Sequence, residues 1–246
     1  MPQLAQHLKW TYEDFLLFPD DGKRHELIDG EHIMSPSPFT KHQRILGNLF
    51  IVIKLFLKSH RMGEAFIAPM DVVLSDTDVV EPDLLFIASE HASIITEKHI
   101  MGVPDLIVEV LSEGSGTETC ATRNMSQMGL GRKTDEIIKR RLYEQYGVKE
   151  YWIIDPELES VKARSGLCPS ERGAWGHLER SEQGPHMEKV YRWHENMCHT
   201  EHVPNSGTGM QSTGFVRVAE LSVENGGTLT TPLLPDLTIP LSDIFG

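Results

Sequence analysis

The sequence contains little cysteine: three residues among 246, with no CxxC pair. An odd cysteine count without paired spacing argues against a disulfide framework and agrees with a reducing compartment. No apolar run approaches the roughly 20 residues of a membrane-spanning helix. The opening residues MPQLAQHLKW also lack the apolar region of a signal peptide. We therefore expect a cytoplasmic protein without a membrane segment.

The composition is that of an ordinary globular protein, with 39% hydrophobic and 24% charged residues. Core-like segments occur from the N-terminus to the last residues, which predicts one domain over 1–246. Two long stretches, at about 113–131 and 164–214, show no periodicity and are interpreted as inserted loops. Loops of this length are uncommon in compact domains and are usually functional or disordered. A further hypothesis is that these insertions fold on a partner.

Acidic residues predominate, and the net charge of −13 by itself disfavours a nucleic-acid partner. The distribution is uneven, however. The segment 41–61 holds five basic residues and no acid, 132–141 is also basic, and 76–118 contains ten acids against Lys98 alone. This division fits a cation site beside a phosphate-binding surface, and two solvated helix faces would explain it equally well.

The hydrophobic periodicity predicts an α/β (α+β) fold, a mixed sheet flanked by helices. A capping box at 11–14 starts a short helix, and apolar residues at helical spacing over 40–60 predict a long amphipathic one. Another helix is expected over 134–146, with Thr134 as its N-cap, Ile137, Ile138 and Leu142 toward the core and Gly147 after its end. Strands are expected in a hairpin over 25–34, at about 64–75, 83–88 and 105–112, at 150–156, from 161, and at 215–222.

Glu109 is the most informative residue, because it interrupts the apolar strand DLIVEVLS at 105–112. Alternation places Leu106 and Val108 on one face, and Ile107 and Glu109 on the other. Since both faces are apolar, the strand is expected to be buried on both sides. A lone carboxylate there costs several kcal/mol unless it is neutralised, paired or bound to a metal. A buried pair with Lys or Arg and a metal site both remain open.

Asp83 is a second carboxylate, at the head of the apolar strand in EPDLLFI. Two acids on neighbouring strands suggest a site for Mg²⁺ or Mn²⁺, which prefer hard oxygen ligands. A turn or cap would also account for Asp83 taken alone. Glu26 alternates with its neighbours in the strand HELI, so it points either outward or into the same site.

Three polar residues of the 134–146 helix share one stripe at i, i+4 and i+8: Asp135, Lys139 and Tyr143. The stripe borders the core face, so Lys139 can reach toward a carboxylate of the neighbouring sheet. The alternative is a surface pair between Asp135 and Lys139 worth a few tenths of a kcal/mol.

The later insertion contains a His–Cys–His spacing that zinc could use, and the ligands would be His194, Cys198 and His202 with Cys168. Incidental His and Cys in a polar segment explain this spacing better.

Several segments in order resemble the Uma-two family of restriction endonuclease-like proteins, part of the PD-(D/E)XK nuclease superfamily. They are HELIDG, an SPSP loop followed by HQRI, EPDLLF, DLIVEVLS, DEIIKRRLYEQYGVKEYWIIDP and LLPDLTIPLSDIFG. The resemblance covers about 10–163 and 215–246, and it implies a restriction-endonuclease-like core with the two stretches as insertions.

The resemblance also implies roles for individual residues. Asp83 corresponds to the PD aspartate and Glu109 to the acid of the second motif, while Glu26 and His42 match an early glutamate and a helix-start histidine. The lysine of the superfamily pattern is expected two residues after Glu109, where this sequence has Leu111. In this family that lysine lies in the following helix, which here gives Lys139.

The implied activity is that of a Mg²⁺-dependent endonuclease that cleaves DNA, with Mn²⁺ as an alternative ion and a homodimer as its assembly. Asp83, Glu109 and the Val110 carbonyl would hold the metal. Glu26 would complete the metal sphere, and Lys139 would orient water or stabilise charge on the phosphate. DNA contacts are expected from the start of the 40–60 helix, at Lys41, His42 and Arg44.

The other open reading is a nucleic-acid-binding or interaction protein on the same fold that does not cleave. The insertion before Lys139 lengthens the connection from Glu109 and could misplace the lysine.

Overall fold

The computed structural model describes residues 9–35, 37–111, 132–166 and 215–246. The described helices are α1 (Tyr12–Phe15), α2 (Thr40–His60), α3 (Arg132–Tyr146) and α4 (Leu241–Phe245), with a 3-10 helix η1 at Ser89–Ile94. The described strands are β1 (Arg24–Ile28), β2 (Glu31–Ser35), β3 (Gly63–Ile67), β4 (Val72–Ser75), β5 (Asp78–Val80), β6 (Leu84–Ala88), β7 (Ile100–Met101), β8 (Leu106–Val110), β9 (Glu150–Asp155), β10 (Ser160–Ser165), β11 (Val216–Ser222), β12 (Thr228–Thr230) and β13 (Thr238–Pro240).

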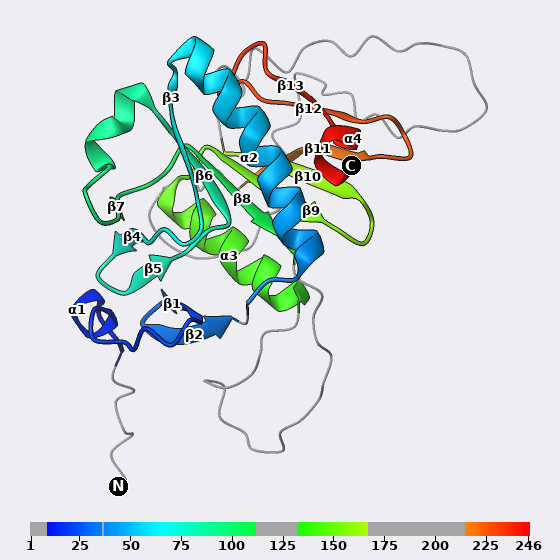
Figure 1. Ribbon diagram of the computed structural model, residues 1–246. Helices are drawn as coiled ribbons and strands as arrows, with labels where there is room; N and C mark the ends of the chain where they lie inside the picture. Colours follow the sequence, from blue (N-terminus) through cyan, green and yellow to red (C-terminus); the bar gives the residue numbers. More distant parts are fainter. Residues whose placement is uncertain (1–8, 36, 112–131, 167–214) are drawn as a thin grey trace, which may run out of the picture.

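A six-stranded central sheet organises the fold, in the order β11-β10-β9-β8-β6-β3. Strands β8 and β9 run parallel and are connected through α3, while the other neighbours in this sheet are antiparallel. A smaller sheet has the order β2-β1-β5-β4-β7, and β12 pairs with β13. Figure 1 shows α2 and α3 on opposite sides of the central sheet. The expected mixed sheet flanked by helices is therefore confirmed.

Both faces of β8 are buried, as the sequence predicts. Leu106, Val108 and Val110 pack in a core with α2 and the C-terminal segment, whereas Ile107 packs in the core that includes α3. Full burial of each such aliphatic side chain is worth roughly 1.5–3 kcal/mol. Glu109 lies on the α3 face, where two α3 side chains bond to it.

Several predicted turns and caps are confirmed. Thr11 and Asp14 form the capping box of α1, and Asp29 and Gly30 join β1 to β2 with φ values of 52° and 72°. Left-handed φ angles at both central positions are those of a tight hairpin turn, and they favour an Asp-Gly pair. Gly147 ends α3 with φ of 76°.

Some predicted boundaries are wrong. The strand expected at about 64–75 is two strands, β3 and β4, which belong to different sheets. The loop between them contains Pro69, which has no N–H to donate to a strand ladder. The helix expected from Thr134 begins at Arg132, so Thr134 is not its N-cap. Ile137 is 44% exposed rather than in the core, because the buried side of α3 runs through Lys139 and Leu142.

The predicted insertions lie almost wholly outside the described residues, and so does the His–Cys–His spacing of the second one. Strand β10 continues through Arg164 and Ser165, so the second stretch without regular structure cannot begin at 164. Among the described helices, none is long and apolar enough to cross a membrane.

The C-terminal segment is tied to the central sheet by Glu150, which opens β9 and is fully buried. Its Oε2 accepts hydrogen bonds from Trp152 Nε1 at 3.2 Å and from Thr231 Oγ1 at 2.8 Å. Burial raises the pKa of Glu150 to about 8, although the two hydrogen bonds oppose the rise. The carboxyl is therefore mostly protonated in the folded protein at neutral pH.

This raised pKa makes stability depend on pH. Between the ordinary pKa near 4.5 and about 8 the folded chain holds a proton that the unfolded chain releases. Stability must then fall as pH rises through this window, by up to about 1.4 kcal/mol per pH unit. We expect Glu150→Gln to remove this slope and to be more stable than wild type at pH 8. Urea unfolding at pH 5, 6.5 and 8 measures the dependence of stability on pH, with Glu157→Gln, a change at an exposed position, as control. Equal slopes for Glu150→Gln and wild type would contradict the prediction.

Candidate functional site

Asp83 and Glu109 are brought together by the register of β6 and β8. The antiparallel ladder pairs Leu84 with Val108, so the next positions outward, Asp83 and Glu109, lie opposite each other at one end of the two strands. Both side chains are buried, with 1% and 7% of their residue surface exposed. Main-chain pairing thus places two carboxylates at the same end of the central sheet.

Strand β1 adds an acid and an arginine to this end of the sheet. Arg24 and Glu26 are two residues apart and therefore share one side of the strand. Leu27 pairs with Val79 of β5, so β1 runs beside the segment that leads to Asp83. The Glu81 N–H donates to Glu26 Oε1 at 2.9 Å, which fixes Glu26 against that segment.

Helix α3 supplies Lys139 and Tyr143, which lie one turn apart and both reach Glu109. Lys139 Nζ is 3.0 Å from Glu109 Oε1 and 3.1 Å from Glu26 Oε1. The Tyr143 hydroxyl donates to the same Glu109 oxygen at 2.8 Å. All four side chains are buried. The ion pair that was one alternative for Glu109 is therefore present, and Lys139 joins two strands through one ammonium.

Asp83 is held by three donors from three elements. Arg24 Nη2 donates to its Oδ1 at 2.8 Å, the Val110 N–H donates to Oδ2 at 2.7 Å, and His42 Nε2 lies 3.1 Å from Oδ2. Arg24 Nε also lies 3.2 Å from Glu81 Oε1. Each oxygen of Asp83 thus has a donor within the chain.

The two central carboxyls differ in their affinity for protons. Burial would raise the pKa of Asp83, but the hydrogen bond from His42 and the charge of Arg24 hold it well below its usual range. Burial raises the pKa of Glu109 well above its usual range, and the charge of Asp83 adds to the rise while Lys139 opposes it. Neighbouring acids whose pKa values are driven apart are typical of acid–base and metal sites.

Two buried polar atoms of this group have no hydrogen-bond partner among the described residues, Glu26 Oε2 and His42 Nδ1. Buried polar atoms are nearly always bonded, so each orphan needs an explanation such as a bound ion or water. A free carboxylate oxygen is the ligand type that Mg²⁺ and Mn²⁺ prefer. The side chains present therefore fit a divalent-metal site with Glu26, Asp83 and Glu109 as its oxygen donors.

The four residues predicted as catalytic thus lie together, and we call Glu26, Asp83, Glu109 and Lys139 the carboxylate–lysine site. Leu111, where the superfamily pattern has its lysine, is not part of it. Val110, predicted to offer its carbonyl to a metal, donates its N–H to Asp83.

The three predicted DNA-contacting residues separate in the structure. His42 is buried against Asp83, while Lys41 and Arg44 are exposed on the first turns of α2. The imidazole therefore contacts the carboxylate–lysine site, and of these three residues only the two cations face solvent.

Three residues in contact with the site had no predicted role: Arg24, Glu81 and Tyr143. Only Tyr143 carried a local signal, because it follows Lys139 by one helical turn on the stripe already noted. Asp135, the third member of that stripe, has a side chain outside the described set.

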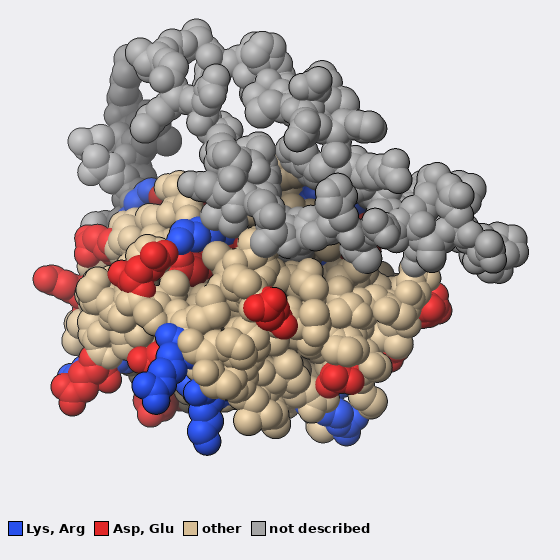
Figure 2. Space-filling view, turned by 90° about the horizontal axis from the view of Figure 1, so that it is seen from above, with Lys and Arg blue, Asp and Glu red and all other residues tan. Residues whose placement is uncertain are grey.

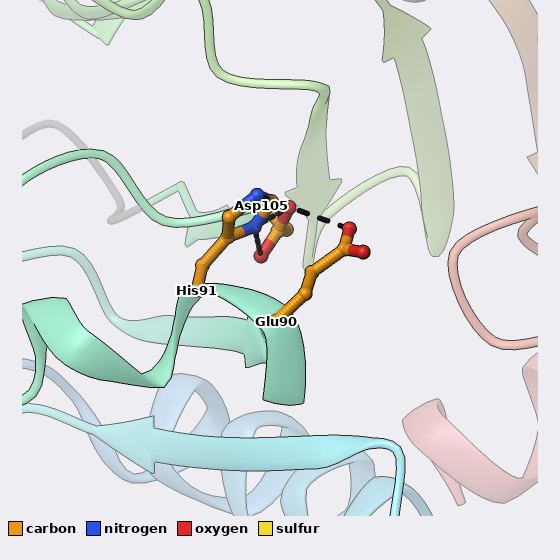
Figure 3. Close-up of side chains that lie close together, drawn as sticks. All are labelled: Glu90, His91 and Asp105. Atoms are coloured by element: carbon orange, nitrogen blue, oxygen red, sulfur yellow. Dashed lines mark hydrogen bonds and ion pairs between the residues drawn. The ribbon is translucent and has the colours of Figure 1, made fainter.

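A second group of candidate metal ligands lies at the opposite end of β8 (Figure 3). Ligand atoms of Glu90, His91 and Asp105 all fall within 4.8 Å of one another. His91 Nδ1 is 2.9 Å from both oxygens of Asp105, and the Ala88 N–H donates to Asp105 at 2.8 Å. Lys149 Nζ lies 2.9 Å from Asp105 and 3.5 Å from Glu90. The lysine ammonium already supplies the positive charge that this cluster needs.

The charged surface mixes both signs. Where described residues are visible in Figure 2, separate groups of Lys or Arg and of Asp or Glu are scattered over a mostly uncharged surface, with one acidic group near its middle. The basic groups visible there do not join into a continuous tract of the kind that would bind a phosphate backbone. Lys41 and Arg44 are exposed cations on the same turns of α2 as His42, which contacts Asp83.

Comparisons with known proteins identify the family and the fold. A family model named Uma2 and described as "Putative restriction endonuclease" matches residues 12–171. Among solved structures, the chain is similar to "a putative nuclease belonging to DUF820 from Anabaena variabilis ATCC 29413", with a TM-score of 0.56 and 18% identity over 96% of this chain and 97% of that one. At this identity the likeness shows the fold alone. No curated protein matches. Because the family model spans well over half of the sequence, the chain belongs to the Uma2 family.

Proposed function

We propose that the protein is a Mg²⁺-dependent endonuclease that hydrolyses DNA phosphodiester bonds, with Mn²⁺ as an alternative ion. One observation carries the proposal: the Lys139 ammonium contacts both Glu26 and Glu109, and Glu109 lies opposite Asp83 on the neighbouring strand. Buried ion groups of this kind often add little stability over apolar packing, so their presence points to chemistry. Membership in a family described as restriction endonucleases supports it.

Each residue of the site has a task in this proposal. Glu26, Asp83 and Glu109 offer the oxygens that would hold the ion, and the bound ion would polarise the scissile phosphate and lower the pKa of its water. Lys139 contributes a buried positive charge that stabilises the charge developing on the phosphate. Tyr143 orients the Glu109 carboxylate through its hydroxyl, a role of supporting residues around metal sites.

The proposed DNA partner approaches from the N-terminal end of α2. Exposed Lys41 and Arg44 lie on either side of His42 in the sequence and can bind backbone phosphates. We also propose a homodimer, because a two-fold assembly presents one site to each strand of a duplex.

A DNA-binding protein without cleavage is the second candidate. It is favoured by the internal bonding of the site, since both oxygens of Asp83 accept bonds from the chain and Lys139 bridges the other two acids. Each acid of such a site already contacts a cation of the chain, Arg24 or Lys139, so the site can serve the fold alone.

Titration calorimetry with Mn²⁺ separates the candidates, and the matched control lies in the second cluster. We expect wild type to bind Mn²⁺ at one site. Asp83→Asn should bind Mn²⁺ at least about tenfold more weakly, because a charged ligand is lost. Glu90→Gln should bind Mn²⁺ as wild type does. Plasmid cleavage with Mg²⁺ is measured in parallel and is expected to follow Mn²⁺ binding.

Two results would overturn the proposal. Binding that is lost in Glu90→Gln and kept in Asp83→Asn would assign the ion to the second cluster. Wild type that binds DNA but neither Mn²⁺ nor Mg²⁺, and does not cleave, would establish the second candidate.

A further inference from the structure

We infer that Arg24 is the resident counter-cation of Asp83, that a divalent ion displaces it from Asp83 Oδ1, and that the released guanidinium binds a substrate phosphate. This inference rests on the proposed function and deepens it. It gives a binding role to a residue that lies outside the carboxylate–lysine site.

Arg24 engages two carboxylates with different atoms of its guanidinium. Nη2 donates to Asp83 Oδ1 at 2.8 Å, and Nε lies 3.2 Å from Glu81 Oε1. The side chain keeps 18% exposure, whereas Asp83 has 2%. Arg24 is therefore the more exposed member of this ion pair.

The two oxygens of Asp83 are not equivalent. Oδ2 accepts from the Val110 N–H at 2.7 Å and faces His42 Nε2, so both of its contacts belong to the fixed framework of β8 and α2. Oδ1 is bonded to Arg24. An incoming cation can therefore reach Asp83 at Oδ1 by exchange with a single flexible side chain.

The charge count at this end of the sheet favours such an exchange. Four acids (Glu26, Glu81, Asp83 and Glu109) face the side chains of Arg24 and Lys139, with the His42 imidazole against Asp83, so carboxyl groups outnumber the arginine and lysine by two. A divalent ion adds positive charge where acids are in excess. Glu26 Oε2, buried without a partner among the described residues, offers the second oxygen.

The released guanidinium stays at the site because its Nε contact to Glu81 does not involve Asp83. Its Nη2 then lacks an acceptor, while the positive charge remains. A planar guanidinium with two free N–H groups matches the geometry of a phosphate better than an ammonium does. Arg24 would thus hold a phosphate next to the ion that replaced it.

Replacing Arg24 tests the inference, because the two effects have opposite signs. Arg24→Met removes a competing charge next to Asp83, so Mn²⁺ should bind about tenfold tighter by calorimetry. The same variant loses a charged phosphate contact, so a DNA duplex should bind about tenfold weaker in Ca²⁺. Lys23→Met, which removes an exposed charge one residue away, should change both by less than twofold. A purely structural role for Arg24 predicts weaker binding of both ligands and would overturn the inference.

A second measurement uses the unaltered protein, so it decides the question even if Arg24→Met does not fold. The side-chain Nη2–H signal of Arg24, the group that would leave Asp83, is followed by NMR during titration with Mg²⁺ and is assigned with Arg24→Lys. We expect this signal to shift with the same midpoint as ion binding, and an unmoved signal at saturating Mg²⁺ would overturn the inference. If wild type binds no divalent ion at all, the proposed function itself fails, which is a distinct outcome.

Discussion

Glu109→Gln is expected to reduce Mg²⁺-dependent DNA cleavage by about a thousandfold, while the protein stays folded. Glutamine keeps the length of the side chain and an oxygen that can accept from Lys139 and Tyr143. It removes the negative charge that would hold the ion. Because a bound ion contributes several kcal/mol to transition-state stabilisation and each 1.36 kcal/mol is tenfold in rate, a loss of roughly three orders of magnitude follows.

Initial rates of supercoiled plasmid nicking measure this loss, and circular dichroism checks that the variant is folded. The matched control is Glu64→Gln, an exposed acid on β3 of the same sheet. We expect it to cleave like wild type. Nicking by Glu109→Gln at the wild-type rate would remove Glu109 from the metal site and leave it as a structural ion-pair partner of Lys139.

Lys139→Met is expected to have the largest effect on stability. The ammonium is the shared partner of Glu26 and Glu109, and all three side chains are at least nine-tenths buried. Removing one member of a buried ion group leaves uncompensated charge and typically costs about 3–5 kcal/mol. We expect a loss of this size in the free energy of unfolding at pH 8, together with loss of cleavage.

The loss should shrink at acid pH. Burial already raises the pKa of Glu109, and without the ammonium that opposes this rise the pKa must climb further. A carboxyl with a raised folded pKa binds a proton on folding, so stability increases as pH falls toward its unfolded pKa. Urea unfolding at pH 8 and 5.5 measures this difference, with the exposed Lys58→Met on α2 as control. A pH-independent loss, or a larger one at pH 5.5, would show that Lys139 acts through packing of its aliphatic chain.

Much of the site is predictable from local pattern. Glu109 is conspicuous because alternation along its strand assigns it to an apolar face, and Asp83 because it opens another buried strand. The helical stripe shared with Tyr143 leaves two alternatives for Lys139, a carboxylate of the sheet or a surface pair with Asp135, and the family resemblance selects the first. For Glu109 and Lys139 a short-range period indicates the direction of the side chain, and the sequence alone contains that period.

Other features depend on pairing between distant segments and have no local signature. Arg24 and its acceptor Asp83 are 59 residues apart in the sequence. They meet only because β1 lies beside β5 in the smaller sheet. His42 looks like one of three solvent-facing residues at a helix start, and only the packing of α2 on the central sheet shows that it is buried. Ile137 was assigned to the core of α3 from its apolar character alone. In the structure the ion pair of Lys139 orients the lysine inward, and Ile137 lies on the exposed side of the helix.

The register of β6 and β8 has a consequence for how such proteins diverge. The separation of positions 83 and 109 is set by main-chain hydrogen bonds between the strands, not by the acids themselves. Single codon changes at either position can therefore remove or restore an activity while the backbone is inherited unchanged. We expect descendants of one ancestral chain to share this sheet while differing in whether they cleave, bind or merely fold.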